Sequence, residues 1–308
     1  MRLVADIGGT NTRLAMVPSG SVRPAAPKSY RNADYASFEA VISEFLPLSG
    51  AEPPDQLVVA MAGPVTGNTG RLTNLDWLID GAQLSMRFSD IPVRVINDLT
   101  ALGYSALRLS EDQLKPLLVR DVPPSPQRQA LVVGIGTGFN VSPVVDTKDH
   151  IICPSVEAGH TSLYASIAAM LDSYQGGRAN SFPSVESLFS GRGRRKFLSL
   201  MTGQTVESAT PFIQKYRAPE NAAFDQALDA YAELIGALIA ELKLAYLPTD
   251  GIFLAGGVTR SSLIEDRVDL CCNMIERDND WVNIKPPVWM IDDDTAALTG
   301  CASIELAS

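Results

Sequence analysis

The chain has 308 residues, 46% of them hydrophobic, and a formal net charge of −10 at pH 7. A chain of this size can bury a large core, and we expect two lobes. The acidic balance argues against a nucleic acid or an anionic membrane surface as partner. A phosphorylated ligand remains compatible with it, because glycine-rich turns bind phosphate through backbone N–H groups.

Cysteine usage and hydropathy point to a cytoplasmic protein. The sequence has four cysteines without CxxC spacing or the framework of a small secreted domain: Cys153, Cys271, Cys272 and Cys301. This pattern is typical of a reducing compartment. An apolar run already begins at Leu3, which leaves no room here for a signal peptide. Residues 231–246 predict a buried amphipathic helix and not a membrane span, because Glu233, Glu241 and Lys243 interrupt it.

The first motif is a glycine-rich turn between two apolar runs. One run ends at Asp6, the turn reads Gly8-Gly9-Thr10-Asn11, and the second run leaves from Leu14. We predict a hairpin whose backbone N–H groups can cradle phosphate. Asp6 would repel phosphate directly, so we expect it to face a hydrated Mg²⁺. A Gly-Gly hairpin without a ligand is the alternative interpretation.

Further elements follow in chain order. The apolar pattern predicts a helix over 34–46, strands over 57–61 and 93–96, a helix opening at 97, a second hairpin from 131, a polar loop over 175–184, a strand over 288–291 and a last helix from 294. Asp34 is available to cap the first helix. The proline-rich stretch 111–129 shows no regular apolar pattern, and we predict an interdomain linker there.

Two motifs recur in the same order. Asp6-Ile-Gly-Gly-Thr-Asn matches Gly134-Ile-Gly-Thr-Gly-Phe, and Ala62-Gly-Pro-Val-Thr matches Ala255-Gly-Gly-Val-Thr. Every copy follows an apolar run. Two ordered repeats indicate a duplicated α/β unit, in which each half brings a glycine-rich hairpin to a shared cleft.

Asp98 is the candidate catalytic base. Phosphoryl transfer to a hydroxyl needs a carboxylate that accepts the hydroxyl proton. Asn97-Asp98-Leu-Thr-Ala lies where a predicted strand passes into a helix, which is a rigid place to hold one. Aspartate at a helix start is also a common N-cap, so the sequence alone leaves both roles open.

These motifs, together with Glu157-Ala-Gly-His160 and Ser-Val-Glu186-Ser-Leu-Phe-Ser-Gly, resemble the actin/hexokinase/Hsp70 phosphotransferase superfamily. Within it, the chain is similar to bacterial glucokinases of the type without zinc. The resemblance implies an α/β fold: a two-lobed, actin-like (ribonuclease H-like) ATPase fold with duplicated βββαβα units around a central cleft. It implies a small domain of residues 1–110 plus 294–308 and a large domain of residues 111–293.

The same resemblance implies an ATP-dependent hexose kinase that converts D-glucose to glucose 6-phosphate at the start of glycolysis. Asp98 would be the base and would contact the sugar with the residues of the sugar pocket: Asn97, Glu157, His160, Glu186, Gly63 and Asn74. A second set would hold ATP and its phosphates: Asp6, which reaches Mg²⁺ through water, Gly8, Gly9, Thr10, Asn11, Gly136, Thr137, Gly138, Gly256 and Gly257.

A purely structural role is the alternative for several of these residues. A lone histidine such as His160 is more often packed or on the surface. Glu186 could be a first-turn acid that the helix dipole favours, and turn chemistry alone could explain Gly63 and Asn74. Three stretches depart from the glucokinase pattern: Phe139-Asn140, the basic run 190–195 and Asp292-Asp293-Asp294.

The sequence also bears on other functions. There is no Gly-Lys dipeptide and hence no P-loop. Residues 161–172 contain no cysteine, so we expect no zinc, unlike in the neighbouring ROK family. A ROK-type repressor would need a DNA-binding motif before Asp6. The alternatives are a kinase for another hexose or an N-acetyl amino sugar, and a non-catalytic sugar-binding relative. We expect no nucleic acid or membrane partner, and we leave a homodimer open.

Overall fold

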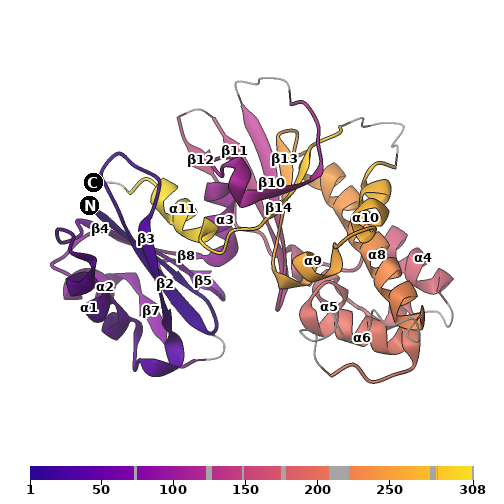
Figure 1. The fold of residues 1–308 in the computed structure, drawn as a ribbon, viewed down its shortest axis with the longest axis horizontal. Helices are drawn as coiled ribbons and strands as arrows, with labels where there is room; N and C mark the ends of the chain where they lie inside the picture. The colour runs from indigo at the N-terminus through magenta and orange to yellow at the C-terminus, as the bar shows by residue number, and fades with distance from the viewer. Residues whose placement is uncertain are drawn as a thin grey trace. The chain divides into compact units, whose positions relative to one another are not determined.

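The computed structural model describes residues 1–72, 75–122, 127–147, 149–174, 178–207, 222–277, 282 and 284–306. By its internal contacts the chain divides into two units. Unit 1 comprises Met1–Gln113, Asp149–Cys153 and Asp293–Ser308, and unit 2 comprises Leu114–Lys148 and Pro154–Asp292. Each unit is built around one large β-sheet (Figure 1).

The sheet of unit 1 has the strand order β3 (Ala25–Arg31), β2 (Asn11–Val17), β1 (Arg2–Ile7), β4 (Gln56–Met61) and β8 (Val93–Asn97). Strands β1, β4 and β8 are parallel. Strand β2 pairs antiparallel with β1, and β3 pairs antiparallel with β2. Residues on both faces of β1 and β4 are buried, as expected of parallel strands that helices cover on each side.

Two pairs of helices cover the two faces of this sheet (Figure 1). The helix α1 (Phe38–Ser49) packs with α2 (Gly81–Arg87) on the face that carries Leu3 and Leu57. On the face of Val4 and Val58 lie α3 (Asp98–Ala106) and α11 (Ala296–Ser303). Gly300 of α11 faces the backbone of α3, where a Cβ would clash with the carbonyl oxygen of Ala101. The two helices therefore pack backbone against backbone.

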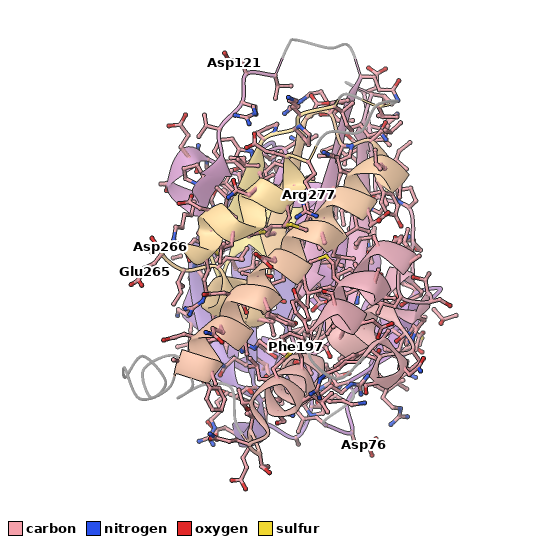
Figure 2. All side chains as sticks on the ribbon, turned by 90° about the vertical axis from the view of Figure 1, so that its right-hand side faces the viewer. Asp76, Asp121, Phe197, Glu265, Asp266 and Arg277 are labelled. Atoms are coloured by element: carbon pink, nitrogen blue, oxygen red, sulfur yellow. The ribbon has the colours of Figure 1, made fainter. Side chains whose placement is uncertain are left out.

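The strands of unit 2 form a sheet in the order β11 (Phe139–Asp146), β10 (Arg128–Ile135), β13 (Gly251–Ala255), β14 (Val288–Ile291) and β9 (Leu114–Leu118). The two-residue strand β12 (Ile151–Ile152) falls within the residues of unit 1. Its helices are α4 (Ala165–Ser173), α5 (Val185–Leu188), α6 (Gly191–Thr202), α8 (Ala222–Tyr246), α9 (Gly257–Ser262) and α10 (Arg267–Ile275). Phe197 is fully buried in this unit against the ring of Tyr231, whereas Glu265 and Asp266 are exposed (Figure 2).

The predicted duplication is confirmed by the topology. In both units the first strand of a hairpin also pairs with a parallel strand, and a further parallel strand lies next to that one. The resulting orders are β2-β1-β4-β8 in unit 1 and β11-β10-β13-β14 in unit 2. The two hairpin turns differ in length. Ile7 pairs with Thr12, but Ile135 pairs with Phe139, so the second turn is one residue shorter.

Several local expectations need correction. Residues 114–118 of the predicted linker form β9, which pairs antiparallel with β14 as the edge strand of the unit 2 sheet. Residues 123–126 lie outside the described residues. The helix α1 begins after Ser37, because Asp34 belongs to a separate 3₁₀ helix, Asn32–Asp34. The last helix begins at Ala296, two residues later than predicted.

Short elements complete the fold. Residues 62–80 hold a small sheet of β5 (Val65–Thr66), β6 (Thr69–Arg71) and β7 (Leu78–Asp80). Further 3₁₀ turns span Glu111–Gln113, Ala158–His160 and Ala179–Ser181. Among the described residues, none of the helices combines the length and hydropathy that a membrane crossing requires.

Candidate functional site

The candidate residues of unit 1 lie where its parallel strands end. Asp6 is the penultimate residue of β1, Gly63 follows β4, and Asn97 and Asp98 join β8 to α3. The register pairs Ile7 with Met61 and Met61 with Asn97, so these positions share one edge of the sheet. Open α/β sheets bind ligands at this carboxyl edge. Asn74 lies outside the described residues.

Asn97, and not Asp98, is the N-cap of α3. The Asn97 side-chain oxygen accepts a hydrogen bond from the Leu99 N–H (2.9 Å), and its amide donates to the Gly63 carbonyl (3.0 Å). Asp98 is the first helical residue and accepts from the same N–H (2.8 Å). Burial raises its pKa, although this backbone contact and the Asn97 amide oppose the shift. Because Asn97 already caps the helix, capping alone does not account for a carboxylate at position 98.

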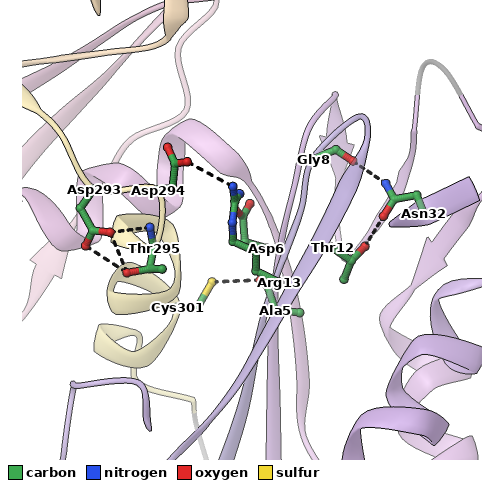
Figure 3. Close-up of polar contacts among 10 residues, drawn as sticks. All are labelled: Ala5, Asp6, Gly8, Thr12, Arg13, Asn32, Asp293, Asp294, Thr295 and Cys301. Carbon is green, nitrogen blue, oxygen red and sulfur yellow. Dashed lines mark hydrogen bonds and ion pairs between the residues drawn. The ribbon is translucent and has the colours of Figure 1, made fainter. Parts of the chain in front are cut away.

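Asp6 is a buried carboxylate beside a second acid. Only 8% of the residue is exposed. Burial and the negative charge of Asp98 raise the pKa of Asp6 to about 6, whereas Arg13 opposes this shift. The Arg13 guanidinium lies between two carboxylates, at 3.4 Å from Asp6 Oδ2 and at 3.4 Å from Asp294 Oδ2 (Figure 3). One arginine thus links β1, β2 and the segment that leads into α11.

Replacing Asp6 with Asn should stabilise the folded protein at high pH. The folded-state pKa of about 6 lies above the ordinary value of 3.8. Below pH 3.8 Asp6 is protonated in both the folded and the unfolded state, so the free energy of unfolding is at its full value. This stability is lost as pH rises through 6, because the buried carboxylate of Asp6 then becomes charged. Asp6→Asn should raise the free energy of unfolding by about 3 kcal/mol at pH 8 and by less at pH 4.5. Thermal unfolding at both pH values measures this difference; a lower Tm at pH 8 would mean that the Arg13 ion pair outweighs burial.

The first hairpin turn contains the predicted phosphate-binding residues Gly8 to Asn11. The Gly8 N–H donates to the Asn11 carbonyl (2.9 Å), which closes the turn, and Thr10 is exposed at its tip. The Asn32 amide donates to the Gly8 carbonyl (2.8 Å) from outside the turn (Figure 3). The turn is therefore held by a residue about twenty positions away.

The second hairpin turn, Gly136 to Gly138, is braced differently. The Gly136 N–H donates to the Gly138 carbonyl (2.9 Å), and the Gly136 carbonyl accepts from the Gly191 N–H (2.8 Å) at the start of α6. Glu186 Oε2 accepts from the Phe139 N–H (3.1 Å), directly after the turn. Thr137 is exposed.

The proposed sugar motif of residues 157–160 lies against this hairpin. Glu157 and His160 are exposed, and His160 ends the 3₁₀ turn. Gly159 is buried, and a Cβ there would clash with the Phe139 carbonyl oxygen and come within 3.3 Å of Glu186 Cβ. This close approach explains why the motif has glycine at its third position.

Glu186 and Asn140 connect the same elements. Glu186 Oε1 lies 2.5 Å from Nη2 of Arg192, whose side chain is 70% exposed. The Asn140 amide donates to the Val156 carbonyl (2.6 Å) and to Glu157 Oε2 (3.3 Å), and its oxygen accepts from the Ala158 N–H (3.0 Å). The structure therefore places Glu157, His160 and Glu186 next to the second hairpin within unit 2.

The second glycine pair lies where β13 passes into α9. Gly256 has φ of +99°, and a Cβ would clash with the Ile135 carbonyl oxygen. Gly257 is exposed and has nothing within 4 Å of an added Cβ. Gly256 thus lets the β13–α9 connection pass close to the strand that leads into the second hairpin.

The residues present fit a hard divalent cation. Asp6 and Asp98 offer only oxygen ligands, which Mg²⁺ prefers. Each carboxylate has a raised pKa, and the charge of Asp98 contributes to that of Asp6. A bound cation would compensate these charges. Within the described ranges there is no cluster of three or more His, Cys, Asp or Glu side chains that could hold a metal by itself.

Three polar residues of the site are not among the residues predicted from the sequence. Arg13 could have been found, because a hairpin that pairs Ile7 with Thr12 places Arg13 opposite Asp6. Asn140 departs from the family pattern in the sequence, and in the structure it organises the Glu157 loop. Asn32 carries no local signal, since its partners are distant in the sequence.

The family model and the curated relatives indicate the same family. The family model described as "Glucokinase" matches residues 3–306. A glucokinase of Caulobacter vibrioides is 32% identical over 271 residues, which cover 83% of this chain and 80% of that protein. The crystal structure of a glucokinase from an Antarctic psychrotroph superposes with a TM-score of 0.81 at 26% identity and covers 98% of this chain and 97% of that one. A Streptomyces griseus ROK-family glucokinase in complex with glucose and AMPPNP (TM-score 0.62, 16% identity, 97% and 98% covered) shares the fold.

Proposed function

Because the chain belongs to the glucokinase family, we propose that it transfers the γ-phosphoryl group of ATP to the 6-hydroxyl of D-glucose, with Asp98 as the base. The observation that carries the proposal is the junction of β8 and α3. There Asn97 caps the helix, and the partly buried carboxylate of Asp98 lies beside it at the carboxyl edge of the sheet. This is the arrangement that a positioned proton acceptor requires.

Asp98 would accept the proton of the attacking hydroxyl as the bond to phosphorus forms. Burial raises its pKa, which makes the ionised carboxylate a stronger proton acceptor. Asn97 fixes the start of α3 and holds the Gly63 carbonyl. Together they would orient the hydroxyl toward the phosphate.

The hairpins would bind the phosphates through backbone N–H groups, which need no positive side chain. When bound, Mg²⁺ would neutralise charge on the β- and γ-phosphates. Asp6 would hold the ion through water, and Asp98 stands nearby. Gly257, which has open space around it, would leave room for the adenosine, and Gly256 would allow the backbone turn that places Gly257 there. All four cysteines are free thiols, in keeping with the cytoplasm as the proposed location.

Glu157, His160 and Glu186 would hold the sugar hydroxyls. A pyranose hydroxyl both donates and accepts, so carboxylates and a neutral imidazole form a matched set. Asn140 supports this part of the proposal, because it fixes both the backbone and the carboxylate of the Glu157 loop.

A coupled assay of ADP release tests the function. With ATP as donor, glucose should give the highest kcat/KM among glucose, mannose, fructose and N-acetylglucosamine. Higher activity on another sugar would make the chain a kinase for that sugar. No turnover on any of them, with sugar binding intact, would favour the non-catalytic alternative.

Removing Arg192 should tighten glucose binding. Its guanidinium contacts Glu186 Oε1, so it competes with a sugar hydroxyl for this oxygen. An exposed pair of this kind is worth roughly 0.2–1 kcal/mol. Arg192→Leu should therefore lower the glucose Kd about 2- to 5-fold and abolish any strengthening of binding by salt. Arg195→Leu, on the same helix, is the control. Weaker binding in Arg192→Leu would make Arg192 itself a sugar ligand.

A further inference from the structure

The first hairpin turn is held by a single asparagine, Asn32. Only 1% of Asn32 is exposed. Its side-chain amide donates to the Gly8 carbonyl (2.8 Å), and its side-chain oxygen accepts from the Thr12 hydroxyl (2.8 Å) (Figure 3). Its backbone N–H donates to the Thr10 carbonyl (2.9 Å). One buried residue thus contacts the turn at three points along its length.

Asn32 is itself fixed from behind. It begins the 3₁₀ helix Asn32–Asp34, and its carbonyl accepts from the Tyr35 N–H (3.2 Å). Thr12 is fully buried, so the hydrogen bond from its hydroxyl is shielded from water. Both functional groups of the Asn32 amide are therefore committed to the hairpin, and its orientation is set by an acceptor on one side and a donor on the other.

These contacts determine where the turn can present its N–H groups. A trans peptide group is planar, so each C=O points opposite to the N–H of the following residue. Asn32 draws the Gly8 and Thr10 carbonyls toward itself. The N–H groups of Gly9 and Asn11 consequently point away from Asn32. Glycine at positions 8 and 9 otherwise allows many backbone conformations.

We propose that Asn32 is a positioning residue for nucleotide binding: it fixes the peptide orientation of the first hairpin so that its N–H groups meet the phosphates. This rests on the proposed function, because it assumes that the hairpin binds phosphate. Asn32 would not contact the reacting atoms and would act through Gly8 and Thr10. Its loss should therefore act on the phosphates of the nucleotide and not on the nucleoside or the sugar.

The test is direct binding of ATP, adenosine and glucose to the full chain by calorimetry. Asn32→Asp keeps the acceptor for Thr12 but removes the donor to Gly8. It should weaken ATP binding about tenfold, the effect of one buried hydrogen bond. Adenosine and glucose should change less than twofold. Thr12→Val is a milder second variant that removes only the hydroxyl orienting Asn32, and it should weaken ATP in the same selective way.

Asn68 offers a matched control in the same unit. Its amide donates to the Val93 carbonyl (2.9 Å) and its oxygen accepts from the Val95 N–H (2.7 Å), so it makes two comparable hydrogen bonds away from the hairpin. Asn68→Asp should leave the ratio of ATP to adenosine affinity unchanged. Equal losses for ATP and adenosine in Asn32→Asp, or unchanged ATP binding in both hairpin variants, would overturn the proposal. Wild-type protein that binds ATP no better than adenosine would instead overturn the phosphate-binding role of the hairpin.

Discussion

Asp98→Asn should lower kcat by about 10²- to 10⁴-fold, the usual contribution of a general base. Asparagine keeps the volume and can still accept the Leu99 N–H bond, but it cannot take a proton. The Kd for glucose should change little. The wild-type enzyme should also lose activity as pH falls through the Asp98 pKa, which burial raises above the ordinary value of 3.8. This acidic limb of the rate profile should be missing in the variant.

Asp80 provides the control for a purely structural aspartate. It is the N-cap of α2, where its side chain accepts from the Ala82 and Gln83 N–H groups. Asp80→Asn preserves a competent cap and should leave kcat within about twofold. If Asp98→Asn behaves like Asp80→Asn, then Asp98 is a structural residue and the proposed mechanism is wrong.

Gly159→Ala should raise the glucose KM at least about tenfold. The added Cβ would clash with the Phe139 carbonyl oxygen and crowd Glu186. Because Phe139 belongs to a buried strand, the loop of Glu157 and His160 has to move instead. A misplaced ligand loop loses several hydrogen bonds to the sugar, each worth about 0.5–1.5 kcal/mol. Steady-state kinetics with each substrate varied would measure the effect.

Overpacking also costs stability, about 1–3 kcal/mol at a well-packed site. Gly203→Ala separates this from the effect on the sugar. Gly203 ends α6 with φ of +69° and has open space around it, so alanine strains the backbone without touching the sugar loop. Both variants should lower the Tm, but only Gly159→Ala should weaken glucose binding. An unchanged glucose KM in Gly159→Ala would separate the 157–160 loop from the sugar site.

The fold could be predicted from sequence because its strongest signals are local. Each hairpin shows two apolar runs around a glycine turn, and the repeat of the pattern indicates the duplication. The prediction of a linker over 111–129 was wrong for β9 for a physical reason. Pro116 cannot donate to a sheet, which argues against a central strand, but β9 is an edge strand and tolerates proline.

The candidate site was only partly predictable. Asp6, Asp98 and the glycine turns lie in short motifs, so their residue types can be read directly. The residues that hold them are brought in by the fold. Asn32 meets Gly8 only once β3 has paired with β2, and Asp294 reaches Arg13 from the far end of the sequence. Capping of α3 by Asn97 could not be separated from capping by Asp98, since both neighbours are good N-cap residues.

The position of α11 has a consequence for how the protein is made. Helix α11 packs on the face of the first sheet that carries Val4 and Val58, and Arg2 donates to the carbonyls of Ala302 and Ile304 (both 2.7 Å). During synthesis, the strands of unit 1 leave the ribosome long before α11 exists. The part of this apolar face that α11 covers, beside α3, stays exposed while unit 2 is translated, and such surfaces are prone to aggregation. The interval is a natural point of action for a chaperone, and slow translation before residue 293 should lower the yield of folded enzyme.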